Sequence, residues 1–201
     1  MEFHIENTEV FGLNKSVIAS GNAMRVVMDD NTKEATEKDY KRAKNLGTTK
    51  PGEAHDQFLT GIIVEFDLYA PLYMWKQLQR YTFLNFISSE STMHRLAKFD
   101  VKAQCVSDTD SVILSRYEEL LNKYNSEELE PETKQSLWRT LVASLPCGFV
   151  LGATMVTNYR SLKTMYLQRK CHKLKEWHEF CDWCETLPRF KELCLKEEVA
   201  E

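Results

Sequence analysis

The sequence predicts a mixed α and β protein of 201 residues that forms a single domain, 1–201, or one protomer of an oligomer with a shared site. Three observations support this. Residues 2–10, 58–68 and 149–157 have strand-like apolar patterns, although for 149–157 periodicity leaves a buried turn open. Apolar residues at helical spacing fill most of the rest. The hydrophobic fraction of 43% is enough for a core, and 28% charged residues is ordinary for a soluble protein.

In the first half of the chain, a strand at 2–10 precedes a helix at 12–24. Residues 29–50 are almost devoid of apolar side chains. They predict a solvated helix or a mobile excursion, or alternatively a flap over a site, since loops beside active sites often order on binding. The strand at 58–68 then leads into an aromatic-rich helix from about Ala70, with a proline in its first turn.

In the second half, a helix is expected at 108–124, with Asp108 or Thr109 as its N-cap. The next helix begins at Pro131 and ends where proline follows Leu145, because proline cannot continue a helix. After the ambiguous segment at 149–157, two more helices complete the chain. Both follow from helical spacing of their apolar residues.

The last helix, at 173–187, carries Cys181 and Cys184 in a CxxC arrangement. A zinc site needs four converging ligands, and the sequence has no second CxxC or HxxxH pair at finger-like spacing. Positions three apart also share one face of a helix. Packing is therefore favoured over zinc binding and over redox chemistry, and no metal site is predicted.

The charge distribution argues against two classes of partner. The formal net charge is −4, so no overall basic field favours nucleic acid or an anionic membrane. The N-terminus lacks the basic and apolar regions of a signal peptide, and no apolar run approaches the roughly 18 residues of a membrane span. A cytoplasmic location is therefore expected.

A dense polar cluster closes the stretch 51–96, directly after a buried strand and a buried helix. Polar side chains at such a place are costly to desolvate unless something binds there, so the cluster predicts a ligand site. A second polar group stands beside apolar surface near 158–169. The members of the first cluster are Gln77, Arg80, Asn85, Ser88, Ser89, Glu90, Ser91, Thr92, His94 and Arg95, and those of the second are Asn158, Arg160 and Arg169.

Common catalytic and nucleotide-binding motifs are missing. The sequence contains no G-x-G-x-x-G and no P-loop, so side chains rather than a glycine-rich loop must hold any nucleotide. It also contains neither a G-x-S-x-G nucleophile elbow nor an H-E-x-x-H zinc motif.

The spacing inside the two clusters resembles the flavin-dependent thymidylate synthase family. One family block has Pro-x-Glu-His, then Gln-x-x-Arg-His-Arg, then Ser/Asn-Glu-x-Ser-x-Arg-Tyr. A second block has Leu-Pro, then Asn-x-Arg-Ser-Leu, then a further arginine. The matching segments here are 51–55 (with one extra residue before His55), 77–80, 89–95, Leu145 with Pro146, 158–162 and Arg169.

This resemblance implies an α/β (α+β) fold, with helices around a twisted, mainly antiparallel sheet, and a homotetramer whose active sites lie between chains. The implied catalytic residues are Arg169, facing the uracil ring, and Ser91. The implied FAD-binding residues are His55, Arg80, Tyr81, Asn158 and Arg160. The implied residues for the substrate dUMP are Gln77, Arg80, Glu90, Ser91, Thr92, Arg95, Arg139 and Arg169. Guanidinium groups suit these roles because they bind phosphate bidentately and always carry charge.

The sequence also departs from the family pattern. The Arg-His-Arg triplet is Arg80-Tyr81-Thr82, and about two extra residues follow it before Glu90. Val142 stands where the family has an arginine ahead of Leu-Pro, and Arg139, one helical turn earlier, is its candidate replacement. Each lost contact to a charged group costs about 1.5–3 kcal/mol unless other residues compensate.

Three functions remain open. The first is reductive methylation of dUMP to dTMP by an FAD-dependent methyltransferase, with methylenetetrahydrofolate as carbon donor and NADPH as reductant. The second is a related flavin enzyme that modifies another pyrimidine nucleotide or produces a different one-carbon outcome. The third is a non-catalytic nucleotide-binding or scaffold protein on the same fold. The altered triplet motivates the second and third.

Overall fold

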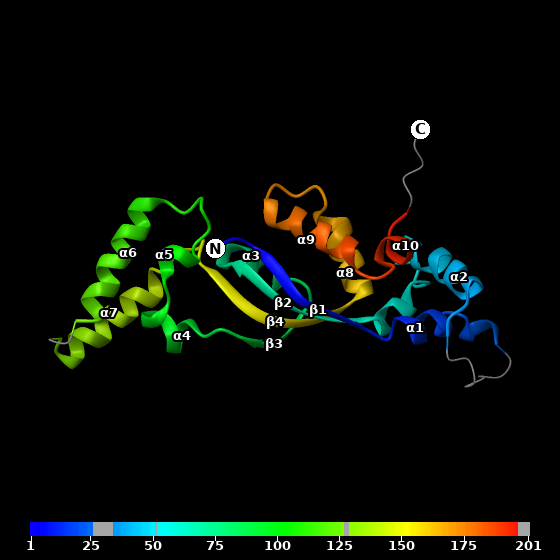
Figure 1. The fold of residues 1–201 in the computed structure, drawn as a ribbon, viewed down its shortest axis with the longest axis horizontal. Helices are drawn as coiled ribbons and strands as arrows, with labels where there is room; N and C mark the ends of the chain where they lie inside the picture. Colours follow the sequence, from blue (N-terminus) through cyan, green and yellow to red (C-terminus); the bar gives the residue numbers. More distant parts are fainter. Residues whose placement is uncertain (26–33, 51, 127–128, 197–201) are drawn as a thin grey trace. The chain divides into compact units, whose positions relative to one another are not determined.

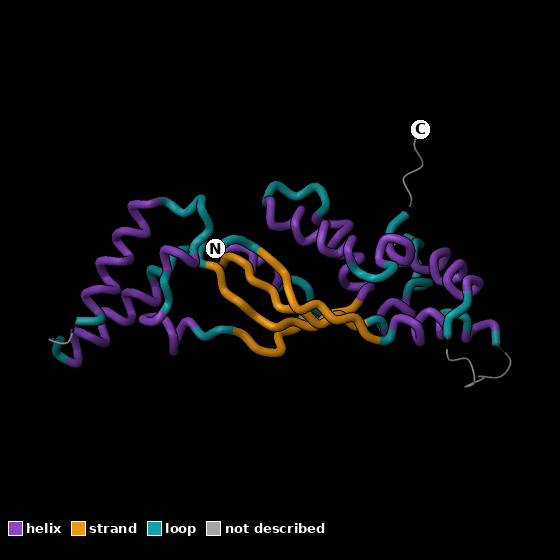
Figure 2. The backbone as a smooth tube through the Cα atoms, viewed as in Figure 1, coloured by secondary structure: helices purple, strands orange, loops and turns teal. Residues whose placement is uncertain are grey.

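The structure, a computed structural model, describes residues 1–25, 34–50, 52–126 and 129–196. Within them, the strands form one mainly antiparallel four-stranded sheet in the order β1-β2-β4-β3 (Figure 2). Its edges are therefore β1 and β3. The strands are β1 (His4–Phe11), β2 (Ile63–Pro71), β3 (Asn85–Ser89) and β4 (Val150–Asn158).

The chain separates into two compact units. Unit 1 comprises Met1–His4, Asp67–Arg80 and Phe86–Thr154, and unit 2 comprises Ile5–Phe66, Tyr81–Asn85 and Met155–Glu201. The expectation of a single domain stays a prediction. The candidate site residues fall into both units.

Unit 1 contains a helical hairpin in which α6 and α7 lie side by side (Figure 1). Its buried core includes Tyr117 from α6, Leu141 from α7 and Phe149 before β4. The Tyr117 hydroxyl donates to the Leu141 carbonyl (3.2 Å), so the one polar atom of this ring is satisfied inside the core. The helices are α3 (Leu72–Leu78), α4 (Thr92–Arg95), α5 (Val101–Gln104), α6 (Ser111–Tyr124) and α7 (Pro131–Ala143), with a short 3₁₀ segment at Leu96–Lys98.

Unit 2 packs α8 against α9, and α10 against α2, as Figure 1 shows. Its core is aromatic: Trp177, Phe180 and Phe190 are fully buried, and the Trp177 and Phe180 rings meet edge to face at 5.5 Å. The helices are α1 (Leu13–Ala19), α2 (Glu37–Gly47), α8 (Tyr159–Arg169), α9 (Lys175–Thr186) and α10 (Phe190–Cys194), with 3₁₀ segments at Asn22–Met24 and Gln57–Gly61.

The predicted fold class is confirmed, and two ambiguities are resolved. Residues 150–158 form strand β4 rather than a buried turn. Part of 29–50 forms the helix α2, whose N-cap Thr36 and Asp39 make a reciprocal capping box. Residues 26–33 lie outside the described residues, so the flap over a site stays a prediction.

Several predicted boundaries were wrong. The strand expected from residue 58 begins at Ile63, because backbone bonds from Leu59 N to Asp56 O (3.1 Å) and from Ile62 N to Leu59 O (3.3 Å) form a 3₁₀ turn first. Pro71 ends β2 and caps α3 instead of lying inside that helix.

The predicted N-cap of α6 and the predicted end of the first helix were also wrong. Asp110, not Asp108 or Thr109, caps α6, because its carboxylate accepts the backbone N–H groups of residues 112 and 113. The helix predicted at 12–24 ends at Ala19 and is followed by a separate 3₁₀ turn. Strand β3 and helix α10 were not predicted.

Cys181 and Cys184 lie buried on the inner face of α9, which agrees with a packing role. Burial raises the pKa of the Cys181 thiol to about 11 and that of Cys184 well above its usual value. Both thiols therefore stay protonated near neutral pH, whereas metal binding and nucleophilic attack need the thiolate. Across the described ranges, no group of three His, Cys, Asp or Glu side chains is placed to hold a metal ion. No helix among the described residues is both long and apolar enough to span a membrane.

Candidate functional site

The residues expected to bind a ligand divide between the two units along the lines of their expected roles. Except for Arg169, every residue expected to bind the nucleotide lies in unit 1. Except for Arg80, every residue expected to bind the flavin lies in unit 2. The unit 1 set is Gln77, Arg80, Glu90, Ser91, Thr92, Arg95 and Arg139, and the unit 2 set is His55, Tyr81, Asn158, Arg160 and Arg169.

In unit 2, helix α8 begins with a polar group. Asn158 is its N-cap, and the Asn158 side-chain oxygen accepts the backbone N–H of Ser161 (3.0 Å). Arg160, in the first turn, donates from Nε to Asp56 (2.9 Å) and from Nη1 to the side chain of Gln57 (2.9 Å). The Nη2 atom of Arg160 makes no hydrogen bond within the described part of the chain, and the side chain is 35% exposed. Two of the three guanidinium nitrogens are thus held, and Nη2 remains available to an acceptor.

Asp56, which holds Arg160, is itself held by a buried lysine. Lys163 donates to Asp56 Oδ2 (2.8 Å) and to the carbonyls of Gly47 (2.7 Å) and Thr49 (2.9 Å). These three acceptors match the three donors of its ammonium group, and its side chain is only 3% exposed. Burial opposes ionisation of Asp56, but the hydrogen bond and charge of Lys163, with the charge of Arg160, outweigh it and hold the pKa below its ordinary value. Asp56 therefore stays a carboxylate.

His55 precedes this carboxylate and is exposed. It makes no hydrogen bond to another described residue, and the preceding residue, Ala54, has a left-handed backbone (φ 60°). The pattern therefore places an imidazole at the surface beside the fixed Asp56–Arg160 pair. His55 lies in a turn, and its role toward a ligand stays a prediction.

At the other end of α8, Arg169 lies against aromatic rings. Its Nε donates to the Tyr81 hydroxyl (2.7 Å), and the guanidinium carbon lies 4.5 Å from the centre of the Trp177 ring. The Tyr81 hydroxyl donates in turn to the side chain of Gln168 (3.2 Å). A guanidinium over an aromatic face is attracted by the ring quadrupole. Arg169 is thus fixed in a cation–aromatic cluster that uses the tyrosine standing in the family's histidine position.

Helical geometry separates the two arginines of unit 2. Arg160 and Arg169 are nine residues apart on α8, which corresponds to about 14 Å along the axis and roughly two and a half turns. They project from opposite sides of the helix. One ligand atom therefore cannot contact both arginines. This arrangement fits the expectation that Arg160 and Arg169 act on two different ligands.

In unit 1, Glu90 is tied to Gly152 of β4. Its backbone N–H donates to the Gly152 carbonyl (3.0 Å), and its carboxylate accepts the Gly152 N–H (2.8 Å). The two residues line a polar hollow of about 190 Å³ with Asp67, Tyr69 and Thr154. Because Glu90 Oε2 accepts this backbone hydrogen bond, the carboxylate has a fixed direction in the hollow.

We expect Gly152→Ala to disturb this hollow. A Cβ at Gly152 would lie 2.7 Å from the ring of Tyr69 and 3.3 Å from the Glu90 carboxylate. Overpacking of this kind costs about 1–3 kcal/mol of unfolding free energy, measurable by urea denaturation. In a Tyr69→Ala background the added cost should fall to a fraction of that. An equal cost in both backgrounds would contradict the predicted clash.

The other expected unit 1 residues have varied environments. Ser91 is the N-cap of α4 and accepts the His94 backbone N–H (3.2 Å), and Thr92 is half-buried. Gln77 is half-buried on α3. The arginines Arg80, Arg95 and Arg139 are exposed, and none of them forms an ion pair within the described residues. Among the described residues, Arg80 pairs with neither Glu65 nor Asp67, the two carboxylates that the sequence offers as purely structural partners for it.

The position where the family has an arginine is apolar here. Val142 packs against the buried cluster that includes Leu141 and Phe149. Arg139 is exposed on α7 and does not belong to that core. The proposed replacement of one arginine by the other stays a prediction.

Comparison with known proteins rests on structure alone, because neither protein-family profiles nor curated protein sequences give a match. A crystal structure of the flavin-dependent thymidylate synthase ThyX from Helicobacter pylori with FAD and dUMP superposes with a TM-score of 0.69. It is 16% identical, over 98% of this chain and 100% of that one. The chain has the flavin-dependent thymidylate synthase fold. A second structure of that enzyme with FAD and dUMP superposes on this fold with a TM-score of 0.68 and 18% identity, over the same shares.

Sequence reasoning missed the residues that hold the arginines on this thymidylate synthase fold. Asp56 and Lys163 fix Arg160, and Trp177 supports Arg169. One signal was available. Lys163 stands between Leu162 and Thr164 on a helix face with buried apolar neighbours, where a charged residue needs a buried partner.

Proposed function

We propose that the protein is an FAD-dependent enzyme that methylates dUMP reductively to dTMP, with methylenetetrahydrofolate as carbon donor and NADPH as reductant. The observation that carries the proposal is the Arg160–Asp56 pair. It presents a fixed, half-exposed guanidinium at the start of a helix, in a fold whose solved members include an enzyme with FAD and dUMP bound. The proposal includes a homotetramer with shared sites and a cytoplasmic location.

The residues of unit 2 fit a flavin dinucleotide chemically. Arg160 offers its charged guanidinium to phosphate through Nη2, the nitrogen that its bonds to Asp56 and Gln57 leave unused. The amide nitrogen of Asn158 donates to no described residue, since only its oxygen is used in capping. His55 offers an exposed imidazole beside them. Arg80 and Tyr81 complete the proposed cofactor set.

The residues of unit 1 fit a nucleoside monophosphate. Arg80 and Arg95 are exposed cations suited to phosphate, and Arg139 is proposed as a third. Gln77, Ser91 and Thr92 offer neutral hydrogen-bonding groups, and Glu90 a directed carboxylate suited to a ribose hydroxyl.

In this mechanism, Arg169 places positive charge where the uracil ring becomes negative. A pre-positioned charge stabilises such a transition state because it needs no reorganisation during the reaction. The contacts with Tyr81 and Trp177 supply that pre-positioning. Ser91, the second proposed catalytic residue, is fixed by capping α4. When bound, FAD supplies the hydride chemistry, and the protein supplies position and electrostatics.

The test is release of tritium from 5-tritiated dUMP by the flavin-loaded protein with NADPH and methylenetetrahydrofolate. The expected results are bleaching of the flavin by NADPH and release of tritium. If the FAD-loaded protein shows no bleaching by NADPH and releases no tritium, the proposal is contradicted. Colourless protein that takes up no added FAD would favour the non-catalytic alternative instead.

One observation favours a second candidate, a flavin enzyme for another pyrimidine nucleotide. Tyr81, in place of the family's histidine, engages Nε of the arginine proposed to face the base. A changed partner at this point alters which base edge the guanidinium recognises. Thermal shifts with dCMP, dUMP and dTMP separate the two candidates. Stabilisation by dUMP alone would exclude the second one.

A further inference from the structure

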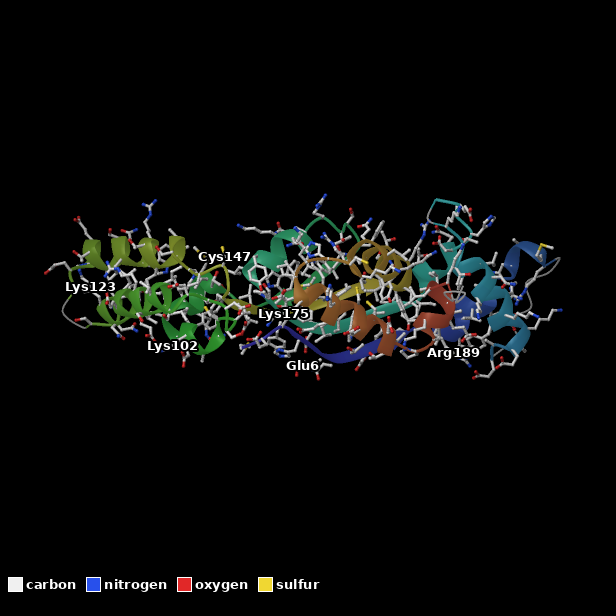
Figure 3. All side chains as sticks on the ribbon, turned by 90° about the horizontal axis from the view of Figure 1, so that it is seen from above. Glu6, Lys102, Lys123, Cys147, Lys175 and Arg189 are labelled. Atoms are coloured by element: carbon white, nitrogen blue, oxygen red, sulfur yellow. The ribbon has the colours of Figure 1, made fainter. Side chains whose placement is uncertain are left out.

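Two contacts of the Arg169 guanidinium fix different aspects of its position in unit 2. The guanidinium carbon lies 4.5 Å from the centre of the Trp177 ring, and Nε donates to the Tyr81 hydroxyl (2.7 Å). Trp177 is fully buried near the start of α9, which begins at Lys175 (Figure 3). The ring quadrupole attracts the cation to the face of the ring, and this attraction changes little when the guanidinium turns about the ring normal. The ring therefore fixes how close the guanidinium lies, and the hydrogen bond fixes which way it points.

Packing holds the Trp177 ring itself in place. The Phe180 ring meets it edge to face at 5.5 Å, and the His172 ring meets it edge to face at 6.2 Å. Burial, followed by the charges of Arg169 and His178, lowers the pKa of His172 below its ordinary value. His172 is therefore uncharged near neutral pH and places no second cation beside the ring.

The Tyr81 hydroxyl is in turn directed by another side chain. It donates to Oε1 of Gln168 (3.2 Å) while it accepts from Nε of Arg169. A phenolic hydroxyl has one proton, which rotates to suit its surroundings. With that proton on Gln168, a lone pair of the hydroxyl oxygen faces Arg169. Gln168 and Arg169 are consecutive residues at the end of α8, so the hydroxyl bridges two neighbours that are about 100° apart around the helix.

The result is a directed chain of hydrogen bonds from Nε of Arg169 through the Tyr81 hydroxyl to Oε1 of Gln168. Consecutive hydrogen bonds polarise one another, so the bond that the hydroxyl donates strengthens the bond that it accepts. Without the Gln168 acceptor, the hydroxyl proton turns to water, and the lone pair is no longer held toward Arg169. Gln168 thus acts on the guanidinium through the tyrosine.

We propose that Gln168 is a positioning residue, which directs the Tyr81 hydroxyl and thereby holds the Arg169 guanidinium in one orientation. Gln168 belongs to neither the proposed FAD set nor the proposed dUMP set. The consequence for turnover rests on the proposed function, in which Arg169 stabilises negative charge that develops on the uracil ring. Because this charge develops in the transition state, loss of orientation lowers kcat and leaves KM for dUMP nearly unchanged.

Exchange of the Arg169 Hε proton with water tests the orientation without flavin or substrate. Its signal in ¹⁵N-edited spectra is identified by its loss in Arg169→Lys. Exchange should accelerate about fivefold in Gln168→Leu, as for an ordinary hydrogen bond, and at least about tenfold in Tyr81→Phe, as for a bond to a charged group. The double variant should match Tyr81→Phe within about twofold, because Gln168 acts through the hydroxyl. Effects that multiply would overturn the proposal.

Internal references and matched variants accompany this cycle. Arg42 and Arg160 also donate from Nε, and their unchanged exchange shows that the fold is intact. Gln168→Glu retains an oxygen acceptor and should keep the exchange of Arg169 Hε within about twofold of wild type. Gln135→Leu removes an exposed glutamine from α7 of unit 1 and should have no effect. Failure of Gln168→Glu to restore protection, or equal acceleration in Gln135→Leu, would overturn the proposal.

Turnover of 5-tritiated dUMP provides the functional half of the test. We expect kcat to fall about fivefold in Gln168→Leu and at least about tenfold in Tyr81→Phe, with no further fall in the double variant and KM for dUMP within about twofold throughout. A raised KM at unchanged kcat would overturn the proposal. Coupled exchange effects with no turnover in the wild type would contradict the proposed function and support the positioning. Multiplied exchange effects with normal wild-type turnover would overturn the positioning alone.

Discussion

Replacing Lys163 by methionine is expected to lower the free energy of unfolding by about 3–5 kcal/mol, because it leaves a buried carboxylate without its main partner. Lys163 is 3% exposed and Asp56 6% exposed, at the side chain. The substitution also leaves the carbonyls of Gly47 and Thr49 without their donor. Urea denaturation at neutral pH measures the change.

The control is Lys41→Met, which removes an exposed lysine from α2 in the same unit. It should change the unfolding free energy by no more than about 0.5 kcal/mol. If Lys163→Met lowers the free energy of unfolding by less than about 1 kcal/mol, the expectation is contradicted, because the buried pair then contributes little to stability.

The pH dependence of stability gives this pair a second readout. The pKa of Asp56 is lowered in the folded state, so its contribution to stability is fully present above the unfolded pKa, about 3.9, and is lost as the pH falls through the lower folded value. In Lys163→Met the Asp56 carboxylate loses the hydrogen bond and charge of Lys163. The part of the unfolding free energy that depends on ionised Asp56 should therefore shrink or change sign. Unfolding free energies measured from pH 7 down to pH 3 test this, and parallel curves for the two proteins would contradict it.

Replacing Arg160 by methionine is expected to weaken FAD binding by about 10- to 150-fold, equivalent to the 1.5–3 kcal/mol of a hydrogen bond to a charged group. The folded protein should lose less stability than Lys163→Met, because Lys163 still holds Asp56. Arg160→Lys should recover only part of the affinity, since an ammonium lacks the planar fork of guanidinium.

The matched control for this second prediction is Arg116→Met. Arg116 is an exposed arginine on α6 of unit 1, where it pairs with Glu119 (2.7 Å). FAD affinity should match wild type within about twofold, since exposed pairs of this kind contribute little. Equal weakening by the two substitutions would indicate a general charge effect and would contradict a specific role for Arg160.

Periodicity predicted the elements that bury one regular face, such as β2 and α7, whereas for β4 it left a buried turn open. It failed where local hydrogen bonds decide. The 3₁₀ turn before β2 follows from a chain turn at Asp56, and the cap of α6 depends on which of two nearby aspartates reaches the first N–H groups. Strand β3 is exposed along its whole length, so no apolar alternation marked it.

The sequence predicted the residue types of the proposed site, which stay a prediction, and it did not predict the residues that hold them in place. The spacing of Asn158, Arg160 and Arg169 identified the polar ends of α8, because the sequence shows polar residues beside apolar surface. It did not show that Asp56 and Lys163 hold Arg160, since their pairing joins positions more than a hundred residues apart. Nor did it show that Tyr81 contacts Arg169. Such pairings arise from tertiary packing.

The most direct test of flavin binding is titration of the purified protein with FAD, followed by the visible absorbance and fluorescence of the flavin. We predict saturable, stoichiometric uptake in the wild type, weaker uptake in Arg160→Met and unchanged uptake in Arg116→Met. No saturable uptake by correctly folded wild-type protein, or uptake that is indifferent to Arg160, would contradict the proposal that this fold holds a flavin through the start of α8.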